Sequence, residues 1–261
     1  MPARVEARKL TKCYASLPAV DQVSFSIRPG ELLGCIGRNG SGKSTIVKML
    51  VGLLEPTFGE VLFEGVSIGH NQTGYKRRLG YVPEEANLYA FLTGWEYLEL
   101  VATLRRMNPK RFEEKASAML EALTMFPHRG SLIASYSKGM RQRIVLIAAM
   151  LDDPDVLVLD EPFSGLDVSS ALVVRKVIQR LAEEGKAVFF SSPVLEVVEK
   201  LCSHLIILRR GSIVASGSMD KVRAGSGATP GLEDAFLEWT EHVDADQIAN
   251  NIVAAVRAPG R

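Results

Sequence analysis

A glycine-rich loop between a buried strand pattern and a helix pattern constrains the fold of this chain more than any other feature. The run Leu32–Ile36 is apolar apart from Gly34, as expected of a strand buried on both faces of a sheet. Apolar residues then recur at helical spacing from Ile46 to Leu54, before Pro56. Between the two lies a loop that fits the pattern G-x-x-x-x-G-K-[ST], made of Gly37, Arg38, Asn39, Gly40, Ser41, Gly42, Lys43, Ser44 and Thr45. Strand, loop and helix predict the beginning of an α/β unit.

This loop has the composition of a phosphate-binding site. Glycines allow the backbone to curl so that its N–H groups converge on phosphate oxygens. A helix that begins near Lys43 adds the positive end of its dipole. The Lys43 ammonium is expected to reach the β- and γ-phosphates, and the Ser44 hydroxyl to bind Mg²⁺. A purely structural glycine turn is the alternative, and the flanking strand and helix patterns argue against it.

A pair of carboxylates follows a second buried strand pattern. Asp160 and Glu161 come directly after Val156–Leu159. A carboxylate at the end of a parallel strand lies beside the crevice in which α/β folds bind ligands. We expect Asp160 to hold Mg²⁺, directly or through water. Glu161 is expected to polarise an attacking water as general base.

The chain is organised around these two motifs. Short strands are predicted in the first thirty residues, a hairpin over residues 59–68, and further strands over residues 187–190, 205–208 and 213–215. Helical patterns dominate from about residue 87 to residue 150. Residues 223–231 are rich in glycine and small residues, which predicts a linker.

Composition excludes some classes of protein. The net charge of +1 gives no general attraction to nucleic acid, so no nucleic-acid partner is expected. Three cysteines, widely spaced, fit neither a disulfide framework nor a zinc site. No run approaches the roughly 20 apolar residues that cross a bilayer. We therefore expect any membrane role to depend on a partner.

From about residue 4 to residue 240 the sequence resembles the ABC ATPases, the nucleotide-binding subunits of ABC transporters. The segment that begins at Tyr136 is similar to the signature Leu-Ser-Gly-Gly-Gln of that family, and its matching residues are Ser137, Lys138, Gly139 and Met140. The residues themselves predict that Ser137 caps the helix over Ile144–Met150 and forms a second anion site there. The resemblance implies that this signature meets the ATP held by a second ATPase subunit, identical or different.

The resemblance also implies a fold and further site residues. The fold is an α/β P-loop NTPase with a mixed sheet core, an N-terminal antiparallel β subdomain and an inserted helical subdomain. The ATPase domain would span residues 1–222, with the helical subdomain over about 87–150, the linker over 223–231 and a C-terminal extension over 232–261. Tyr14 resembles the aromatic residue that stacks on adenine. Asp167 lies in a Ser-Gly-Leu-Asp loop similar to the one that contacts the opposite subunit.

Two positions depart from the family pattern. Glu84 follows Tyr81–Pro83 where the family has glutamine, which adds negative charge near the triphosphate. Pro193 follows Ser191 and Ser192 where the family has a histidine that contacts the γ-phosphate. Proline has neither a side-chain donor nor an N–H. The missing histidine predicts slowed hydrolysis with ATP binding intact. The added charge of Glu84 predicts either weaker nucleotide affinity or altered coupling to the membrane subunit.

The resemblance implies an ATP- and Mg²⁺-dependent ATPase on the cytoplasmic face of the membrane, bound to an integral-membrane permease. Export is favoured by the signature, by the segment after Tyr81–Pro83, and by Leu232–Trp239, which is similar to a closing stretch of exporter subunits. Two alternatives stay open: a weakly hydrolysing, regulatory half of an asymmetric pair, and a soluble ABC protein without a transport role.

Overall fold

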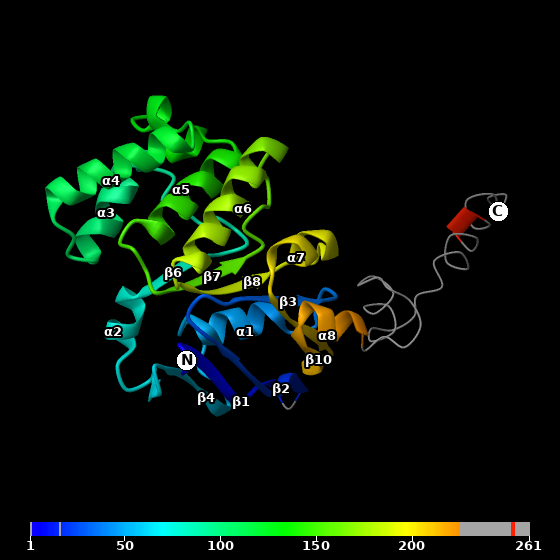
Figure 1. Ribbon diagram of the computed structural model, residues 1–261. Helices are drawn as coiled ribbons and strands as arrows, with labels where there is room; N and C mark the ends of the chain where they lie inside the picture. Colours follow the sequence, from blue (N-terminus) through cyan, green and yellow to red (C-terminus); the bar gives the residue numbers. More distant parts are fainter. Residues whose placement is uncertain (1, 16, 225–251, 254–261) are drawn as a thin grey trace, which may run out of the picture.

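A six-stranded mixed sheet with strand order β10-β9-β3-β8-β7-β6 forms the centre of the molecule. This computed structural model describes residues 2–15, 17–224 and 252–253 (Figure 1). The strands are parallel except for β10, which is antiparallel to its neighbour β9. Their bounds are β3 Leu32–Gly37, β6 Leu79–Val82, β7 Val156–Asp160, β8 Ala187–Ser191, β9 His204–Arg209 and β10 Ser212–Ser218.

A second, antiparallel sheet has the order β2-β1-β4-β5. Its strands are β1 Val5–Tyr14, β2 Leu17–Ile27, β4 Phe58–Phe63 and β5 Val66–Ser67. Together with α1 (Lys43–Leu50) and α2 (Gln72–Arg77), it encloses one hydrophobic core against the central sheet. The rings of Phe25 and Phe189 stack across this core with their centroids 5.7 Å apart.

Helices cover the other face of the central sheet and enclose a second core. They are α5 Lys138–Met150, α6 Val168–Glu183, α7 Leu195–Leu201 and α8 Met219–Ala224. Figure 1 shows the sheet between α5, α6 and α7 on one side and α1 with the antiparallel strands on the other. Because both faces are covered, every residue of β3, β7 and β8 is buried, which explains their continuous apolar sequences.

A third core lies among the helices between β6 and β7. It packs α3 (Gly94–Leu104) and α4 (Pro109–Ala122) against α5, with short 3₁₀ turns at Phe126–His128 and Ile133–Ser135. Thr93 and Glu96 form a capping box at the beginning of α3. Asn108 caps α4, and Pro109 occupies its first turn. The predicted fold class, an α/β chain with a mixed sheet, an antiparallel sheet and a helical insertion, is confirmed.

Some predicted element boundaries are wrong. The helix after the phosphate loop ends at Leu50 rather than near Leu54, because Gly52 takes a left-handed conformation (φ 66°) that breaks it. Leu53 is consequently 63% exposed. The helix that Ser137 was predicted to cap begins, as that cap requires, at Lys138.

The predicted linker over 223–231 and the C-terminal extension over 232–261 fall mostly outside the described residues. Arg223 and Ala224 belong to α8, so the linker does not begin at Arg223. Ile252 and Val253 are helical and exposed. Within residues 2–15, 17–224 and 252–253, none of the helices is both long and apolar enough to span a bilayer.

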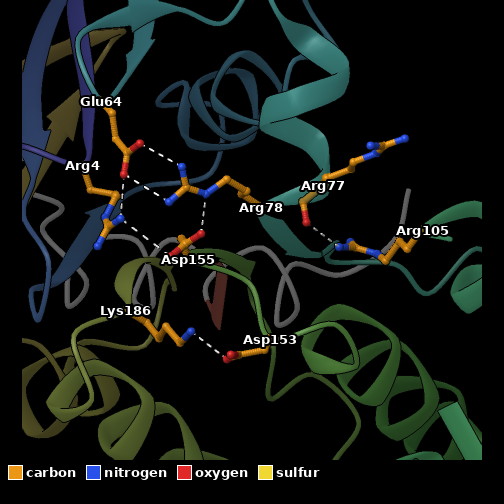
Figure 2. Close-up of polar contacts among 8 residues, drawn as sticks. All are labelled: Arg4, Glu64, Arg77, Arg78, Arg105, Asp153, Asp155 and Lys186. Atoms are coloured by element: carbon orange, nitrogen blue, oxygen red, sulfur yellow. Dashed lines mark hydrogen bonds and ion pairs between the residues drawn. The ribbon is translucent and has the colours of Figure 1, made fainter. Parts of the chain in front are cut away.

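Two arginines and two carboxylates tie the antiparallel sheet to the central sheet (Figure 2). Arg4 contacts Glu64 at 2.7 Å and Asp155 at 3.6 Å. Arg78 contacts Glu64 at 2.8 Å and Asp155 at 2.5 Å. Since Arg78 and Asp155 directly precede the parallel strands β6 and β7, this network lies at the amino ends of those strands. It is therefore at the edge opposite the predicted nucleotide site.

Candidate functional site

The carboxyl ends of the parallel strands bring the two main sequence motifs to one edge of the sheet. The phosphate loop follows β3, and Asp160 ends β7. Strand β8 lies between these two strands, and its Ser191 is in register with Cys35 of β3 and with Asp160. Glu84 follows β6 on the same edge. The strand order thus brings the phosphate loop and the carboxylates to the same edge of the sheet, where the sequence predicted a ligand-binding crevice.

The phosphate loop has the tight, left-handed turns that its glycines permit. Gly40 and Gly42 have φ of 79° and 106°. A Cβ on Gly37 would lie only 2.4 Å from the Ser41 hydroxyl oxygen. The amide of Gly211 donates to the carbonyl of Ser41 at 2.9 Å, which fixes the loop to the β9–β10 turn. No side chain caps the beginning of α1, so its first N–H groups are available to an anion.

Lys43 lies inside this loop. Its side chain is on the first turn of α1, and the residue is only 6% exposed. The ammonium donates to the carbonyl of Gly37 at 2.7 Å and to the carbonyl of Arg38 at 3.3 Å. The positive charge is therefore held where the loop N–H groups converge, as expected of a lysine that binds phosphate oxygens.

Asp160 and Glu161 occupy different environments at the end of β7. Asp160 is buried and accepts a hydrogen bond from the Ser191 hydroxyl. Glu161 is less buried, and its amide donates to the carbonyl of Ser191 at 3.1 Å. Its φ of 47° turns the chain out of the strand, into a turn that the Ser164 amide closes on the Glu161 carbonyl at 3.0 Å. Ser191 thus holds the Asp160 carboxylate through its hydroxyl and the Glu161 backbone through its carbonyl.

Burial and mutual repulsion make both carboxyl groups weaker acids. Burial is the largest cause that raises the pKa of Asp160, and the charge of Glu84 adds to it. The same two causes, in the same order, raise the pKa of Glu161. Asp160, Glu84 and Ser44 line one cavity of about 730 Å³. A divalent cation would offset the repulsion among these groups, so the donor set fits Mg²⁺.

The protein donors for such a cation are few. In the described part of the chain, no group of three or more histidine, cysteine or carboxylate side chains is close enough to hold a metal alone. Mg²⁺ characteristically binds one or two protein groups together with waters and substrate phosphates. Ser44 and Asp160, both on the cavity wall, match that pattern.

The signature segment forms the beginning of α5. The Ser137 hydroxyl accepts a hydrogen bond from the Met140 amide at 3.2 Å, so the predicted cap is confirmed. Ser137 and Lys138 are exposed, while Gly139 is half-buried. A Cβ on Gly139 would lie 2.7 Å from the Gly165 carbonyl oxygen, which explains the glycine. Among the described residues, no hydrogen bond joins residues 137–140 to the phosphate loop of the same chain.

The remaining predicted positions lie around these motifs. Tyr14 is at the end of β1 and is 52% exposed. Asp167 caps α6 through the Ser170 amide at 2.8 Å, and hydrogen bonds from Ser170 and the neighbouring Arg143 lower its pKa to about 2. Pro193 is exposed and follows Ser192, whose hydroxyl accepts a hydrogen bond from the Val194 amide at 3.1 Å.

His204 does not replace the missing histidine. It begins β9, at the amino end of a strand parallel to β3, and its ring contacts Glu31 at 3.3 Å. The amino ends of these strands lie opposite the carboxyl edge that holds Asp160. His204 therefore lies at a strand end away from Asp160.

Three residues at the site were not found from the sequence. Ser191 holds Asp160, the Gln142 amide donates to the Pro162 carbonyl at 3.1 Å, and Arg143 contacts Asp167 at 2.7 Å. Their position offered a weak signal, since Gln142 and Arg143 directly follow the signature and Ser191 ends a strand beside Asp160.

Comparison with known proteins finds similarity to ATP-binding proteins of ABC transporters. A sequence model described as "ABC transporter" matches residues 20–164. The ABC-type transporter ATP-binding protein EcsA of Bacillus subtilis is 32% identical over 241 residues, which cover 91% of this chain and 96% of EcsA. An uncharacterized ABC transporter ATP-binding protein of Synechocystis is 37% identical over 227 residues, which cover 84% of this chain but only 64% of that relative.

A solved structure of an ATP-binding subunit of an ABC transporter has the same fold. Its TM-score is 0.85 at 29% sequence identity, and the match covers 90% of this chain and 98% of that chain. The shared fold includes the sheet edge at which the phosphate loop and the carboxylates lie.

Proposed function

The chain belongs to the family of ABC transporter ATP-binding proteins, and from this premise we propose that it binds and hydrolyses ATP to drive transport through a separate integral-membrane subunit. One observation carries the proposal above all: the phosphate loop, Asp160 and Glu161 lie at one sheet edge, with Lys43 buried inside the loop. A chain that only bound a nucleotide would not need a carboxylate at the position of Glu161.

ATP would bind along the loop. The first N–H groups of α1 and the loop amides would donate to the phosphates, and the Lys43 ammonium would exchange its two carbonyl partners for β- and γ-phosphate oxygens. Tyr14, half-exposed at the end of β1, would stack on the adenine. Ser44 and Asp160 would hold Mg²⁺, whose charge neutralises the triphosphate when it is bound.

Glu161 would act as general base. Its amide is fixed to the Ser191 carbonyl, so its side chain is positioned from a rigid strand end. Burial raises the pKa of the Glu161 carboxyl group, which makes its carboxylate a stronger base than that of an exposed glutamate. It would orient a water toward the γ-phosphate and accept the proton that this water loses.

A second ATPase subunit, identical or different, would complete the site. Ser137 and Lys138 are exposed at the beginning of α5, where the helix end can receive an anion. We propose that residues 137–140, together with Asp167, face ATP held by the other subunit. The absence of hydrogen bonds between residues 137–140 and residues 37–45 within the described part of one chain agrees with this arrangement.

The membrane subunit would dock beside Glu84. The cavity of about 730 Å³ extends from Glu84 and Asp160 to Tyr97 and Val101 of α3, so its wall reaches from the ATP site to the molecular surface. Close to it, Phe91 is 74% exposed and Tyr89 is 55% exposed. Exposed aromatic side chains of this size mark a protein interface. We propose that this docking takes place on the cytoplasmic face of the membrane. We further propose that the direction of transport is export.

Pro193 supports a second candidate, a slowly hydrolysing half of an asymmetric pair. No side-chain donor is present at this position to reach a γ-phosphate. The neighbouring Ser192 is buried, and its hydroxyl oxygen accepts a hydrogen bond from the Val194 amide at 3.1 Å. A soluble ABC protein without a transport role is the remaining alternative.

Membrane association separates transport from that soluble alternative. We expect the full-length chain, expressed in its native host, to sediment with membranes and to be released by detergent. A Phe91→Ser variant should move to the soluble fraction, whereas Val66→Ser, which alters an apolar residue of β5 that is 56% exposed, should not. Sedimentation of the parent chain with ribosomes, or in no particle at all, would contradict the transport role.

A further inference from the structure

The first two turns of α5 present one face to the loop between Glu161 and α6. Gly139 approaches the Gly165 carbonyl so closely that a Cβ would lie 2.7 Å from it, and carbons of the Lys138 side chain lie against Gly165. One turn later, the Gln142 side chain donates to the Pro162 carbonyl at 3.1 Å. Residues three and four apart share a helix face, so these contacts form a single surface.

Arg143 makes the most extensive contact on this surface. Its Nη1 donates to the Thr124 hydroxyl at 3.2 Å. Its Nη2 donates to Oδ2 of Asp167 at 2.7 Å and to the Ser170 hydroxyl at 2.6 Å. The guanidinium therefore joins three partners in the fixed fork geometry that lysine lacks.

These partners belong to different parts of the fold. Thr124 follows α4 in a left-handed conformation (φ 56°) that ends this helix. Asp167 and Ser170 form the N-cap of α6. Arg143 thus connects the helical insertion, the signature helix and the beginning of α6 at one point.

The loop that Arg143 holds begins at the proposed general base. Between Glu161 and Asp167 the chain makes two consecutive turns, closed by the Ser164 amide on Glu161 and by the Leu166 amide on Phe163. A displacement of Asp167 would be transmitted through these short turns to the backbone of Glu161. Small displacements of a catalytic group have large effects on rate.

We infer that Arg143 is a positioning residue that holds the loop 162–167 against α5, so that the signature and the loop from the general base move as one unit. This inference rests on the proposed function and assigns Arg143 a role in the catalytic step rather than in ATP binding. The low pKa of Asp167 keeps that carboxylate ionised for the contact throughout the neutral range. Arg143 itself need touch neither ATP nor water.

The effect on the stability of the fold separates this positioning role from a merely structural one. The Asp167 side chain is 57% exposed, whereas the Arg143 side chain is only 17% exposed and also donates to Thr124 and Ser170. Asp167→Asn, which leaves the arginine in place, should therefore leave the unfolding midpoint nearly unchanged while it weakens the contact that holds the loop. Asp167→Asn is a useful partner variant, because asparagine still caps α6 but no longer carries the charge.

The test compares steady-state ATP turnover of Arg143→Ala, Arg143→Lys, Asp167→Asn and the Arg143→Ala/Asp167→Asn double variant. Arg180→Ala, which removes an exposed arginine paired with Glu183 on α6, is the matched control. We expect kcat of Arg143→Ala to fall by at least about tenfold with KM for ATP nearly unchanged, with Arg143→Lys between it and the parent. The loss of kcat in the double variant should be smaller than the product of the two single losses, because both changes break the contact between Arg143 and Asp167.

Amide hydrogen exchange of residues 162–170, measured without nucleotide, provides a second readout. Faster exchange in Arg143→Ala but not in Arg180→Ala supports the positioning role. Parental kcat and parental exchange in Arg143→Ala, or additive losses in the double variant, would overturn it. If Arg143→Ala does not fold, the same comparison is made with Arg143→Lys and Asp167→Asn. Absence of turnover in the parent, with the exchange difference present, would instead refute the proposed function alone.

Discussion

Pro193 occupies the position at which the resemblance to the family predicts a histidine, and its surroundings explain why this difference would matter. It follows Ser191 and Ser192, which are both buried at the end of β8. Ser191 holds Asp160, and the Ser192 amide donates to the Cys35 carbonyl at 3.3 Å. The segment is therefore aligned with the site up to the residue before Pro193. We therefore predict that the missing side-chain donor at position 193 is what slows hydrolysis.

A Pro193→His substitution tests whether the missing side-chain donor slows hydrolysis. Histidine restores a donor on a backbone that the two preceding serines already fix, so we expect turnover to rise by about tenfold, equivalent to about 1.4 kcal/mol of barrier. Pro193→Ala removes the ring and restores the backbone N–H without adding a side-chain donor, so it should stay near the parent rate. Steady-state ATPase assays at saturating ATP measure both. Equal rates in all three proteins would contradict a role for this position in hydrolysis.

At the scale of elements, the ion network of Figure 2 holds the two sheets together at the edge remote from ATP. The hydrogen bond from Arg78 is the main cause that lowers the pKa of Glu64, and Arg4 adds to it. A carboxyl whose pKa is lower in the folded chain stabilises the fold above its unfolded pKa. This contribution is lost as the pH falls through the folded pKa. The network therefore predicts an acid-sensitive link between the sheets.

Glu64→Gln should reveal that link. The side chain of Glu64 is 43% exposed, so we expect the variant to be less stable at pH 7 by only about 0.5–1 kcal/mol. The difference should shrink as the pH falls from about 5 to 3, because the parent loses its charge there and glutamine has none to lose. Urea unfolding of both proteins at pH 7 and pH 3.5 measures it. A difference that is independent of pH would contradict the ionic origin.

The sequence predicted the elements that carry a strong local signal and missed those decided by distant contacts. Leu32–Ile36 and Val156–Leu159 were predicted as buried strands because both faces of the sheet demand apolar residues. The early end of α1 at Leu50 depends on Gly52, a glycine that helical periodicity does not register. Arg143 is a comparable case, since its partner Asp167 is 24 positions away and only the fold brings them together.

At the scale of the molecule, the proposed ATP-binding residues and the signature lie on different parts of the fold. Its carboxyl edge presents the phosphate loop, Asp160 and Glu161, while the helical insertion carries the signature at the beginning of α5. The proposed docking cavity connects the two, since it is lined both by Ser44 and Asp160 and by Val145 of α5. A membrane subunit bound there would contact the elements that hold ATP and those that meet the second subunit. This arrangement suits a motor in which ATP closes two subunits on each other.

Mg²⁺-dependent ATP turnover by the purified chain, beside that of Glu161→Gln, tests the central claim most directly. We predict measurable turnover in the parent, a loss of at least about 100-fold in the variant, and ATP binding of similar strength in both. Glutamine keeps the shape of the side chain and removes its basicity, so the loss would identify Glu161 as the base. Equal turnover in the two proteins, or none in the parent despite ATP binding and the Pro193→His substitution, would contradict the account of this chain as an ATP-hydrolysing motor.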